Sequence, residues 1–330
     1  MSDRPITSHD VARLAGVSQS AVSRAFTPGA SISPALRAKV KAAATRLGYQ
    51  PNLLPRMMVQ GRSGIIALVI GGAYNPFHAA TLEAFSRALQ DAGKRIMLVQ
   101  GESDRALDEV VGELVGYRVD GVVSALSILS QDAADAISAH RIPVVTLNSG
   151  IMTDYIHVVE IDNAAAGRAA ADMMIARGAR RLAYVGADSI ASRARQQGYR
   201  AAIEAAGLPA PLCLSGDLDH GGGLLAGREM LAASPRPDGI FCVNDLTAIG
   251  VIDALRLEGG LVIPADAQVV GFDNIPAARW PAYGLTTIDQ NVEIMAKRAV
   301  ELLEEPVKEA RKPTVVDFTF TERCTTRPLP

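Results

Sequence analysis

A short polar cluster near the N-terminus has the residue types that proteins use to read DNA bases. Gln19 can pair with the N6 and N7 atoms of adenine, and Arg24 can reach guanine O6 and N7 or a phosphate. Ser18, Ser20 and Ser23 add short hydroxyl groups that can bond base edges or the DNA backbone. The same polarity also fits an ordinary solvated helix face, so these residues alone leave both interpretations open.

The charge of the chain is divided unevenly along its length. Residues 1–64 hold nine Lys and Arg against two Asp and no Glu, a formal charge of +7, whereas the remaining 266 residues carry −9. A small basic segment on a large acidic chain is expected when one domain meets a polyanion and the other does not. The charge therefore favours DNA contact for the polar cluster.

Helix signals place the cluster at the start of a second helix. Residues 7–10 have the spacing of a capping box that starts a first helix, and Gly16 permits a tight turn after it. Ser18 is a fresh N-cap, and Ser33-Pro34 opens a third helix that Gly48 ends. Three short helices, with a tight turn between the first two, are typical of the helix-turn-helix, whose second helix enters the major groove. The apolar residues expected to pack between these helices are Val11, Leu14, Ala15, Val22, Phe26, Leu36, Val40, Ala43, Ala44 and Leu47.

A second set of polar residues comes after the strands expected in the rest of the chain. Asn, Asp and Arg side chains beside an aromatic ring suit a polyhydroxyl ligand, which needs hydrogen-bonding groups for its hydroxyls and an apolar wall for its C–H face. Asn and Asp also cap helices and form turns, so each position alone has a purely structural interpretation. The candidates are Asn75, Phe77, Asn148, Arg195, Asn244 and Asp273.

From residue 65 onward, short β-branched runs alternate with helical stretches. This alternation predicts parallel sheets covered by helices on both faces, and its two successive series predict two similar α/β lobes. Ligands of such sheets bind beyond the carboxyl ends of the strands, so two facing lobes would enclose a cleft between them. The predicted strands are 65–70, 95–99, 121–124, 143–147, 158–161, 181–186, 239–243, 269–272 and 315–320, and the predicted helices are 77–92, 106–117, 131–140, 164–177, 193–206, 222–232, 246–257 and 292–303.

The N-terminal segment resembles the head of the LacI/GalR-type (lactose-repressor family) bacterial transcriptional regulators. The similarity lies in Asp10-Val-Ala-Arg-Leu-Ala-Gly-Val-Ser18, Ala21-Val-Ser-Arg24, Leu47-Gly48-Tyr49 and Pro51-Asn52. The resemblance implies that residues 52–60, beginning with Asn52, form a hinge helix against the minor groove. It also implies that Met58 is the apolar wedge at the central base step, where the family usually has Leu.

The rest of the chain resembles the same family over its whole length. Arg195-Gln-Gln-Gly198-Tyr199, Val243-Asn244-Asp245 and Val269-Val-Gly-Phe-Asp273 are similar to its three effector-site signatures, which occur in the same order. The resemblance implies that Arg195, Asn244 and Asp273 touch a small-molecule effector. It further implies that Asn75-Pro76-Phe77 lines the cleft from the first lobe and that Asn148 adds another polar contact.

The family resemblance implies a small all-α helix-turn-helix head and a two-lobed, periplasmic-binding-protein-like α/β body with parallel sheets. The function implied is that of a sequence-specific DNA-binding regulator, a repressor, controlled by a sugar or sugar derivative. Its expected partners are double-stranded operator DNA, the effector and a second copy of the chain as a homodimer or tetramer, and no cofactor is expected. The expected boundaries are 1–50 for the head, 51–63 for the hinge and linker, 64–161 plus 291–320 for the first lobe, and 162–290 plus 321–330 for the second lobe.

Two other classes of function compete with this interpretation. A transport-type sugar-binding protein would share the lobes, but the basic head and the lack of a secretory signal argue against it. A sugar kinase or hydrolase with Asp273 as base would need a matched acid, a phosphate loop or a metal. The chain has no Walker, G-x-S-x-G or H-E-x-x-H motif, and its five His lack metal-ligand spacing.

Cysteine use and hydropathy predict where the protein works. The three cysteines are odd in number and widely spaced, so we expect them to pack as small apolar residues rather than to form disulfides. No run approaches the roughly 18 apolar residues that a membrane span needs. The sequence therefore predicts a cytoplasmic protein without membrane contact.

Overall fold

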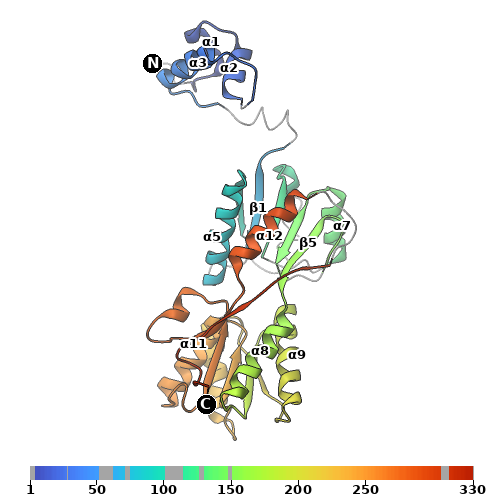
Figure 1. Cartoon of the computed structure of the whole chain (residues 1–330), viewed down its shortest axis with the longest axis vertical. Helices are drawn as coiled ribbons and strands as arrows, with labels where there is room; N and C mark the ends of the chain where they lie inside the picture. Colours follow the sequence, from blue (N-terminus) through green and yellow to red (C-terminus); the bar gives the residue numbers. More distant parts are fainter. Residues whose placement is uncertain are drawn as a thin grey trace. The chain divides into compact units, whose positions relative to one another are not determined.

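Three helices form the described part of the N-terminal unit, residues 1–63, in the computed structural model (Figure 1). They are α1 Ser8–Ala15, α2 Gln19–Phe26 and α3 Pro34–Leu47. The structure describes residues 4–27, 29–51, 62–70, 75–100, 114–125, 130–147, 151–305 and 312–329.

The helix ends in this unit follow the predicted caps. Thr7 and Asp10 form both halves of a capping box, and Gly16 closes α1 in the left-handed conformation at φ 63°. Ser18 accepts a hydrogen bond from the backbone N–H of Ala21, and Ser33 caps α3 in the same way. The predicted helix-turn-helix is therefore confirmed.

The core of the N-terminal unit is small and contains many alanines. Val11, Val22 and Val40 are at most 1% exposed and pack together from the three helices. The prediction for Leu14 is wrong, because its side chain is 41% exposed while Ala12 is buried in its place. Apolar residues at i, i+3 and i+4 show that a helix has an apolar face, but they do not show which of those residues the neighbouring helices cover.

Two six-stranded sheets build the second unit, residues 64–330 (Figure 1). The first sheet has the order β11-β5-β4-β3-β1-β2 and all its pairings are parallel. Its strands are β1 Ile65–Ile70, β2 Arg95–Gln100, β3 Gly121–Ser124, β4 Val144–Leu147, β5 Ile156–Ile161 and β11 Thr314–Val316, and its described helices are α5 Pro76–Asp91, α7 Gln131–Ala139 and α12 Val292–Glu304.

The second sheet has the order β12-β10-β9-β8-β6-β7, and only β12 runs antiparallel to its neighbour. We call each sheet with its covering helices a lobe. The strands of the second lobe are β6 Leu182–Gly186, β7 Leu212–Ser215, β8 Gly239–Cys242, β9 Gln268–Phe272, β10 Thr286–Asp289 and β12 Thr319–Thr321. Its helices are α8 Asn163–Ala176, α9 Ile190–Ala205, α10 His220–Ala232 and α11 Asp245–Asp253, followed by the π-helix Ala254–Glu258 and the 3-10 helix Pro276–Arg279.

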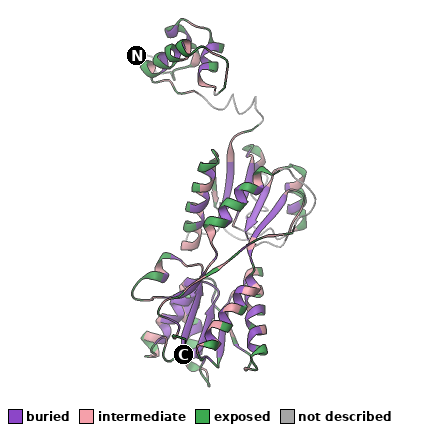
Figure 2. Cartoon of the chain, in the orientation of Figure 1, coloured by how far each residue is buried: buried purple, intermediate pink, exposed green. Residues whose placement is uncertain are grey.

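Both faces of each sheet are covered, as the apolar runs in the strands predict. Alternate strand residues such as Tyr184 and Val185 enter different core clusters, one shared with α8 and α9 and the other with α10 and α11. Figure 2 shows the strands of both sheets buried and exposed residues on the helices around them. The predicted two-lobed α/β fold is confirmed. Among the described residues, no helix combines the length and the apolar character needed to span a bilayer.

The chain passes between the lobes three times, and the last passage corrects a prediction. The single strand expected at 315–320 is in fact two strands, because β11 joins the first sheet and β12 joins the second. The passages lie between β5 and α8, between β10 and α12 at residues 290–291, and between β11 and β12 at residues 317–318. Figure 1 shows these segments running between the two sheets.

Other predictions about local structure also need correction. Strands β7 and β10 were not predicted, and most of the predicted helix 106–117 lies outside the described residues. The helix predicted at 222–232 begins two residues earlier, so residues 221–223 belong to the first turn of α10. A Cβ on Gly223 would lie 2.2 Å from the carbonyl oxygen of Thr247, so glycine here permits close contact between α10 and α11. Cys242 is buried as expected, but Cys324 is exposed.

Candidate functional site

The polar cluster predicted to meet DNA lies on the surface of the N-terminal unit. Ser18, Gln19, Ser20, Ser23 and Arg24 are all exposed, at the N-cap and on the first turns of α2. The Nε2 of Gln19 donates to Ser8 Oγ at 3.0 Å, which fixes its side chain beside α1. The Arg24 Nε lies 3.4 Å from the carbonyl oxygen of Ser20, so its guanidinium rests along its own helix. These contacts are exposed and weak enough to be exchanged for contacts to a ligand.

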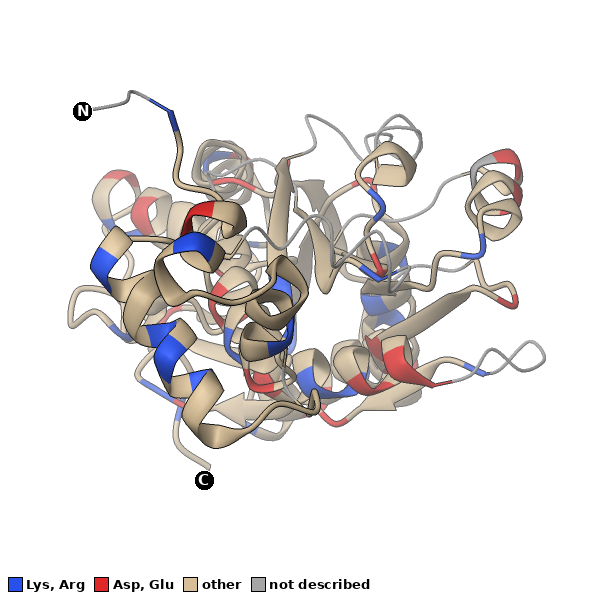
Figure 3. Ribbon diagram, turned by 90° about the horizontal axis from the view of Figure 1, so that it is seen from above, with Lys and Arg blue, Asp and Glu red and all other residues tan. Residues whose placement is uncertain are grey.

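The charge of the N-terminal unit is positive over all three helices. Figure 3 shows Lys and Arg on α1, α2 and α3, and Asp10 is the one acidic residue among those described in this unit. Arg4 bonds both carboxylate oxygens of Asp10, at 2.7 and 3.0 Å. This ion pair and the bonds from Thr7 hold the pKa of Asp10 well below its usual range. Arg4 therefore neutralises the charge of Asp10, and the remaining Lys and Arg residues leave this unit with a positive electrostatic potential.

Three of the predicted site residues lie outside the described residues. Asn52 and Met58, expected in the hinge, fall in the gap between residues 51 and 62, and Asn148 falls between 147 and 151. Their proposed contacts therefore remain predictions.

Arg195, on α9 of the second lobe, is the centre of a buried polar cluster. Its side chain is held by two hydrogen bonds, from Nε to Asn163 Oδ1 at 2.8 Å and from Nη1 to the carbonyl oxygen of Val243 at 2.6 Å. Its guanidinium carbon lies 3.3 Å from the ring centroid of Phe272, a cation–π contact. Burial lowers the pKa of Arg195, and the charge of Asp273 opposes this shift.

Asp273 follows β9 directly and faces the same cluster. Its backbone adopts φ 104°, which is rare for a residue other than glycine, and its N–H donates to the carbonyl oxygen of Ile288. Gln290 Nε2 donates to its Oδ1 at 2.6 Å. Burial raises the pKa of Asp273 to about 7, against the opposing effect of Arg195, and Asp289 raises it further. Both the carboxylate and the carboxylic acid are therefore populated near neutral pH.

Asn244 and Asn75 have the structural role that the sequence left open. Asn244 caps α11 by accepting the N–H of Thr247 at 2.9 Å, and its Nδ2 donates to the carbonyl oxygen of Leu218 at 2.8 Å. Asn75 caps α5 by accepting the N–H of Phe77 at 3.0 Å. Each asparagine thus orders a helix N-terminus.

Phe77 links the two lobes. It belongs to α5 of the first lobe, yet it packs against the core cluster built from α10, α11 and neighbouring strands of the second. Phe77 comes after β1 in the sequence, and through this contact its aromatic ring reaches the second lobe. The structure thus brings Arg195 and Asp273 together at the carboxyl ends of β6, β8 and β9, and gives Phe77 a contact across the lobes.

Asn163 and Gln290 are members of the cluster that were not predicted. Gln290 follows β10, a strand that the sequence analysis missed because it is only four residues long. Asn163 is the first residue of α8, directly after Asp162, which caps that helix. A polar residue just after each strand was the available signal in both cases. Among the described residues there is no group of three or more His, Cys, Asp or Glu side chains that could hold a metal ion.

Comparison with known proteins identifies relatives over nearly the whole chain. Residues 7–52 match the family described as bacterial regulatory proteins, lacI family, and residues 159–327 match the periplasmic binding protein-like domain. The HTH-type transcriptional regulator CelR of Thermobifida fusca is 33% identical over 309 residues, 90% of each chain. The ribose operon repressor of Escherichia coli K12 is 31% identical over 303 residues, 90% of this chain and 92% of the relative.

Solved structures match the same architecture. A complex of the transcriptional regulator CelR with cellobiose has a TM-score of 0.71 at 31% identity and covers 98% of this chain and all of its own. The lac repressor dimer bound to operator and the anti-inducer ONPF has a TM-score of 0.87 at 22% identity, with the same coverage. The second likeness concerns the fold alone.

Proposed function

Because the chain belongs to the LacI family of bacterial regulatory proteins, we propose that a sugar or sugar derivative, bound at the Arg195–Asp273 cluster, controls its binding to operator DNA. The chain is a DNA-binding transcriptional regulator, as are the relatives it matches, and not an enzyme. One of these relatives is named as a ribose operon repressor, and a CelR regulator has been solved in complex with cellobiose.

The observation that carries the proposal is that a buried cation, Arg195, and a half-buried carboxyl group, Asp273, lie close enough to affect each other's charge. Arg195 supplies N–H donors and Asp273 supplies acceptors, while Gln290 and Asn163 orient them. A neutral polyhydroxyl ligand can use both groups, because each hydroxyl both donates and accepts. An anionic ligand would gain from Arg195 but would be repelled by Asp273, so the pair favours a neutral sugar over a sugar phosphate.

The N-terminal unit supports the DNA-binding half of the proposal. We place α2 in the major groove, with Gln19 and Arg24 on base edges and the three serines on bases or phosphates. We place Asn52 and Met58 in a hinge at the operator centre, and Asn148 beside the effector. The working unit proposed is a cytoplasmic homodimer on a palindromic operator, because two half-sites related by a twofold axis call for two heads.

A thermal-shift panel tests the effector. The intact chain is melted with D-ribose, cellobiose, D-glucose, D-galactose and D-xylose, alongside ribose 5-phosphate and guanine as members of other chemical classes. Only a ligand that binds the folded state raises the melting temperature. A rise with a neutral sugar and none with the phosphate supports the proposal, whereas a rise with guanine or the phosphate alone would overturn the assignment of a neutral sugar.

DNA binding is tested with the region upstream of the operon that holds the gene for this chain. Fluorescence anisotropy compares that DNA with a scrambled duplex of equal length, with and without the sugar found above. The regulator proposal expects tighter binding to the upstream DNA and a change in that affinity when sugar is added. Equal affinity for both duplexes at physiological salt would contradict sequence-specific binding.

A further inference from the structure

Two consecutive residues at the end of β9 have left-handed backbone conformations. Asp273 has φ 104° and Asn274 has φ 55°, and neither is glycine. Such conformations are unfavourable for residues with a side chain and persist only when the surrounding structure holds them. Because the turn sets the direction of the Asp273 carboxyl group, whatever holds the turn also positions the effector site.

Arg323, near the end of the chain, holds this turn through the side chain of Asn274. Its Nη2 donates to Asn274 Oδ1 at 2.6 Å, and its Nη1 donates to the carbonyl oxygen of Leu285 at 2.6 Å. Its backbone N–H donates to Thr286 Oγ1 at 2.9 Å, which fixes the residue at the start of β10. The guanidinium thus spans the Asn274 turn and the strand next to it.

The bonds continue from Asn274 to the segments that join the lobes. Asn274 Nδ2 donates to Asp289 Oδ2 at 2.8 Å, and Asp289 Oδ1 accepts the backbone N–H of Asn291 at 2.7 Å. Asn291 in turn donates to the carbonyl oxygen of Asp317 at 2.5 Å. Residues 290–291 and 317–318 are two of the three passages between the lobes, so the turn at Asp273 is bonded to both of them.

We propose that Arg323 is a positioning residue of the effector site, which holds the Asp273 carboxyl group in its binding orientation by clamping Asn274. This inference rests on the proposed function, because it assumes that Asp273 meets the sugar. Arg323 itself does not need to touch the ligand. The clamp also ties the orientation of Asp273 to the passages between the lobes, so a change in lobe arrangement would reach the site through it.

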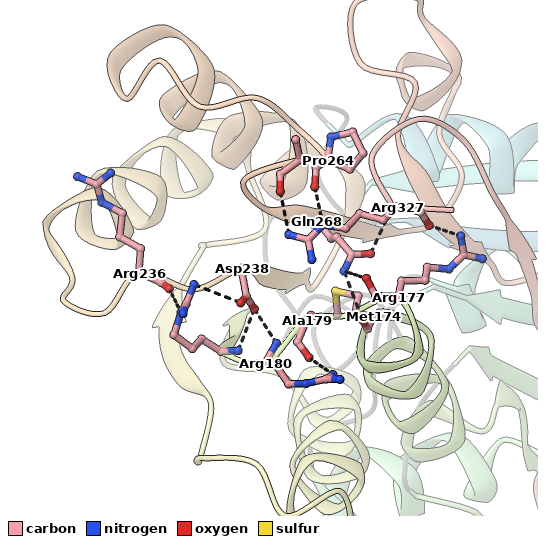
Figure 4. Close-up of polar contacts among 11 residues, drawn as sticks. Met174, Arg177, Ala179, Arg180, Arg236, Asp238, Pro264, Gln268 and Arg327 are labelled. Carbon is pink, nitrogen blue, oxygen red and sulfur yellow. Dashed lines mark hydrogen bonds and ion pairs between the residues drawn. The ribbon is translucent and has the colours of Figure 1, made fainter. Parts of the chain in front are cut away.

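Arg327 provides a matched control on the same C-terminal segment. It also bonds backbone carbonyl oxygens, those of Pro264 at 3.1 Å from Nε and of Ala265 at 2.9 Å from Nη2, and its N–H donates to Gln268 Oε1 (Figure 4). Gln268 is the first residue of β9, so these bonds lie at the opposite end of the strand from Asp273. Removing Arg327 therefore removes comparable bonds without touching the turn.

The first experiment needs no ligand. Hydrogen exchange of the full chain, followed by mass spectrometry, is compared for wild type, Arg323→Ala, Arg323→Lys and Arg327→Ala. Three backbone amides report on the turn. The N–H of Asp273 donates to the carbonyl oxygen of Ile288, that of Asn274 to Thr287 Oγ1, and that of Ile275 to Asp245 Oδ2. Arg323→Ala should raise their exchange by about tenfold or more, and Arg327→Ala should raise exchange around residues 264–268 instead. Lysine can reach one of the two acceptors, so Arg323→Lys should give an intermediate increase.

The second experiment measures affinity by isothermal titration of the sugar that gives the largest shift in the thermal panel. Arg323→Ala should weaken binding by about tenfold or more, while Arg327→Ala should stay within about twofold of wild type at a similar loss of melting temperature. Equal weakening by both variants would show that Arg323 only braces the lobe and would overturn the inference.

The two experiments separate failure of this inference from failure of the proposed function. If no sugar binds the wild type, the effector assignment fails, and exchange still decides whether Arg323 holds the turn. Exchange at residues 273–275 that is unchanged in Arg323→Ala, or raised equally across the whole lobe, would overturn the clamp whatever the ligand.

Discussion

The guanidinium of Arg195 stacks on the ring of Phe272, with its central carbon 3.3 Å from the ring centroid. Phe272 is the last residue of β9 and directly precedes Asp273, so the strand that supports the cation also delivers the carboxyl group facing it. The stacking fixes the plane of the guanidinium, and the bonds to Asn163 and Val243 fix its rotation. The two charged groups therefore need little reorganisation when a ligand enters.

The raised pKa of Asp273 predicts how the stability of the chain depends on pH. In the folded chain its pKa is about 7, against a usual value of 3.8, so between these two pH values the folded state holds a proton that the unfolded state has lost. This group's contribution to stability should be fully present below pH 3.8 and fall as the pH rises towards 7. Asp273→Asn should flatten that part of the profile in urea titrations.

The protonation of Asp273 should also affect sugar affinity, which we expect to increase with pH where the stability decreases. If the ionised carboxylate is the hydrogen-bond acceptor, binding should be strongest above pH 7 and weaken as the pH falls through about 7. Isothermal titration at pH 6 and pH 8 gives the comparison. A sugar affinity equal at both values would mean that the ligand does not distinguish the two forms of Asp273.

Arg24→Ala should weaken specific DNA binding by about 1–3 kcal/mol, because a bidentate contact to guanine would be lost. Gln19→Ala should instead relax the preference at one base position. Anisotropy with a set of single-base operator variants measures both effects. Equal losses on operator and on scrambled DNA in both variants would leave phosphate contacts alone and contradict base reading by α2.

Coupling between the two units predicts that operator and sugar affect each other's affinity by the same factor. Titration of sugar into the protein with and without bound operator measures that factor directly. Asp273→Ala should abolish the response to sugar while leaving DNA binding without ligand within a few-fold of wild type. Identical sugar dissociation constants with and without operator would mean that the regulator has no switch, and an intact response in the variant would remove Asp273 from the effector site.

Gly223→Ala should destabilise the second lobe, because the added Cβ would lie 2.2 Å from the carbonyl oxygen of Thr247 and force α10 away from α11. We expect a loss of about 1–3 kcal/mol in denaturant titrations, typical of overpacking a buried contact. Gly221→Ala is the matched control, two residues earlier in the same helix. Its Cβ would meet only Asp219 Oδ1 at 3.4 Å, so its stability should remain near that of wild type.

The ends of the helices and the alternation of strands with helices were predictable because their causes are local. The caps at Thr7, Ser18 and Ser33 need only a side-chain oxygen and the next few backbone N–H groups, which lie within one turn. The short strands β7 and β10 escaped prediction because four residues carry too little periodicity to mark a strand. Leu14 was wrongly predicted for another reason: its helix was predicted correctly, but the exposure of its side chain depends on how α1 packs against the other helices.

By itself the sequence determined the helix-turn-helix head, the two α/β series, the family resemblance and the candidates Arg195 and Asp273. The tertiary structure decided which polar residues share a site, because that depends on how strands distant in sequence become neighbours. It assigned Asn244 to a helix cap, added Asn163 and Gln290 to the cluster and brought Arg323 against Asn274 across 49 residues of sequence. It also divided the last predicted strand between two sheets, since hydrogen-bond pairing between strands is a property of the folded sheet and not of the segment.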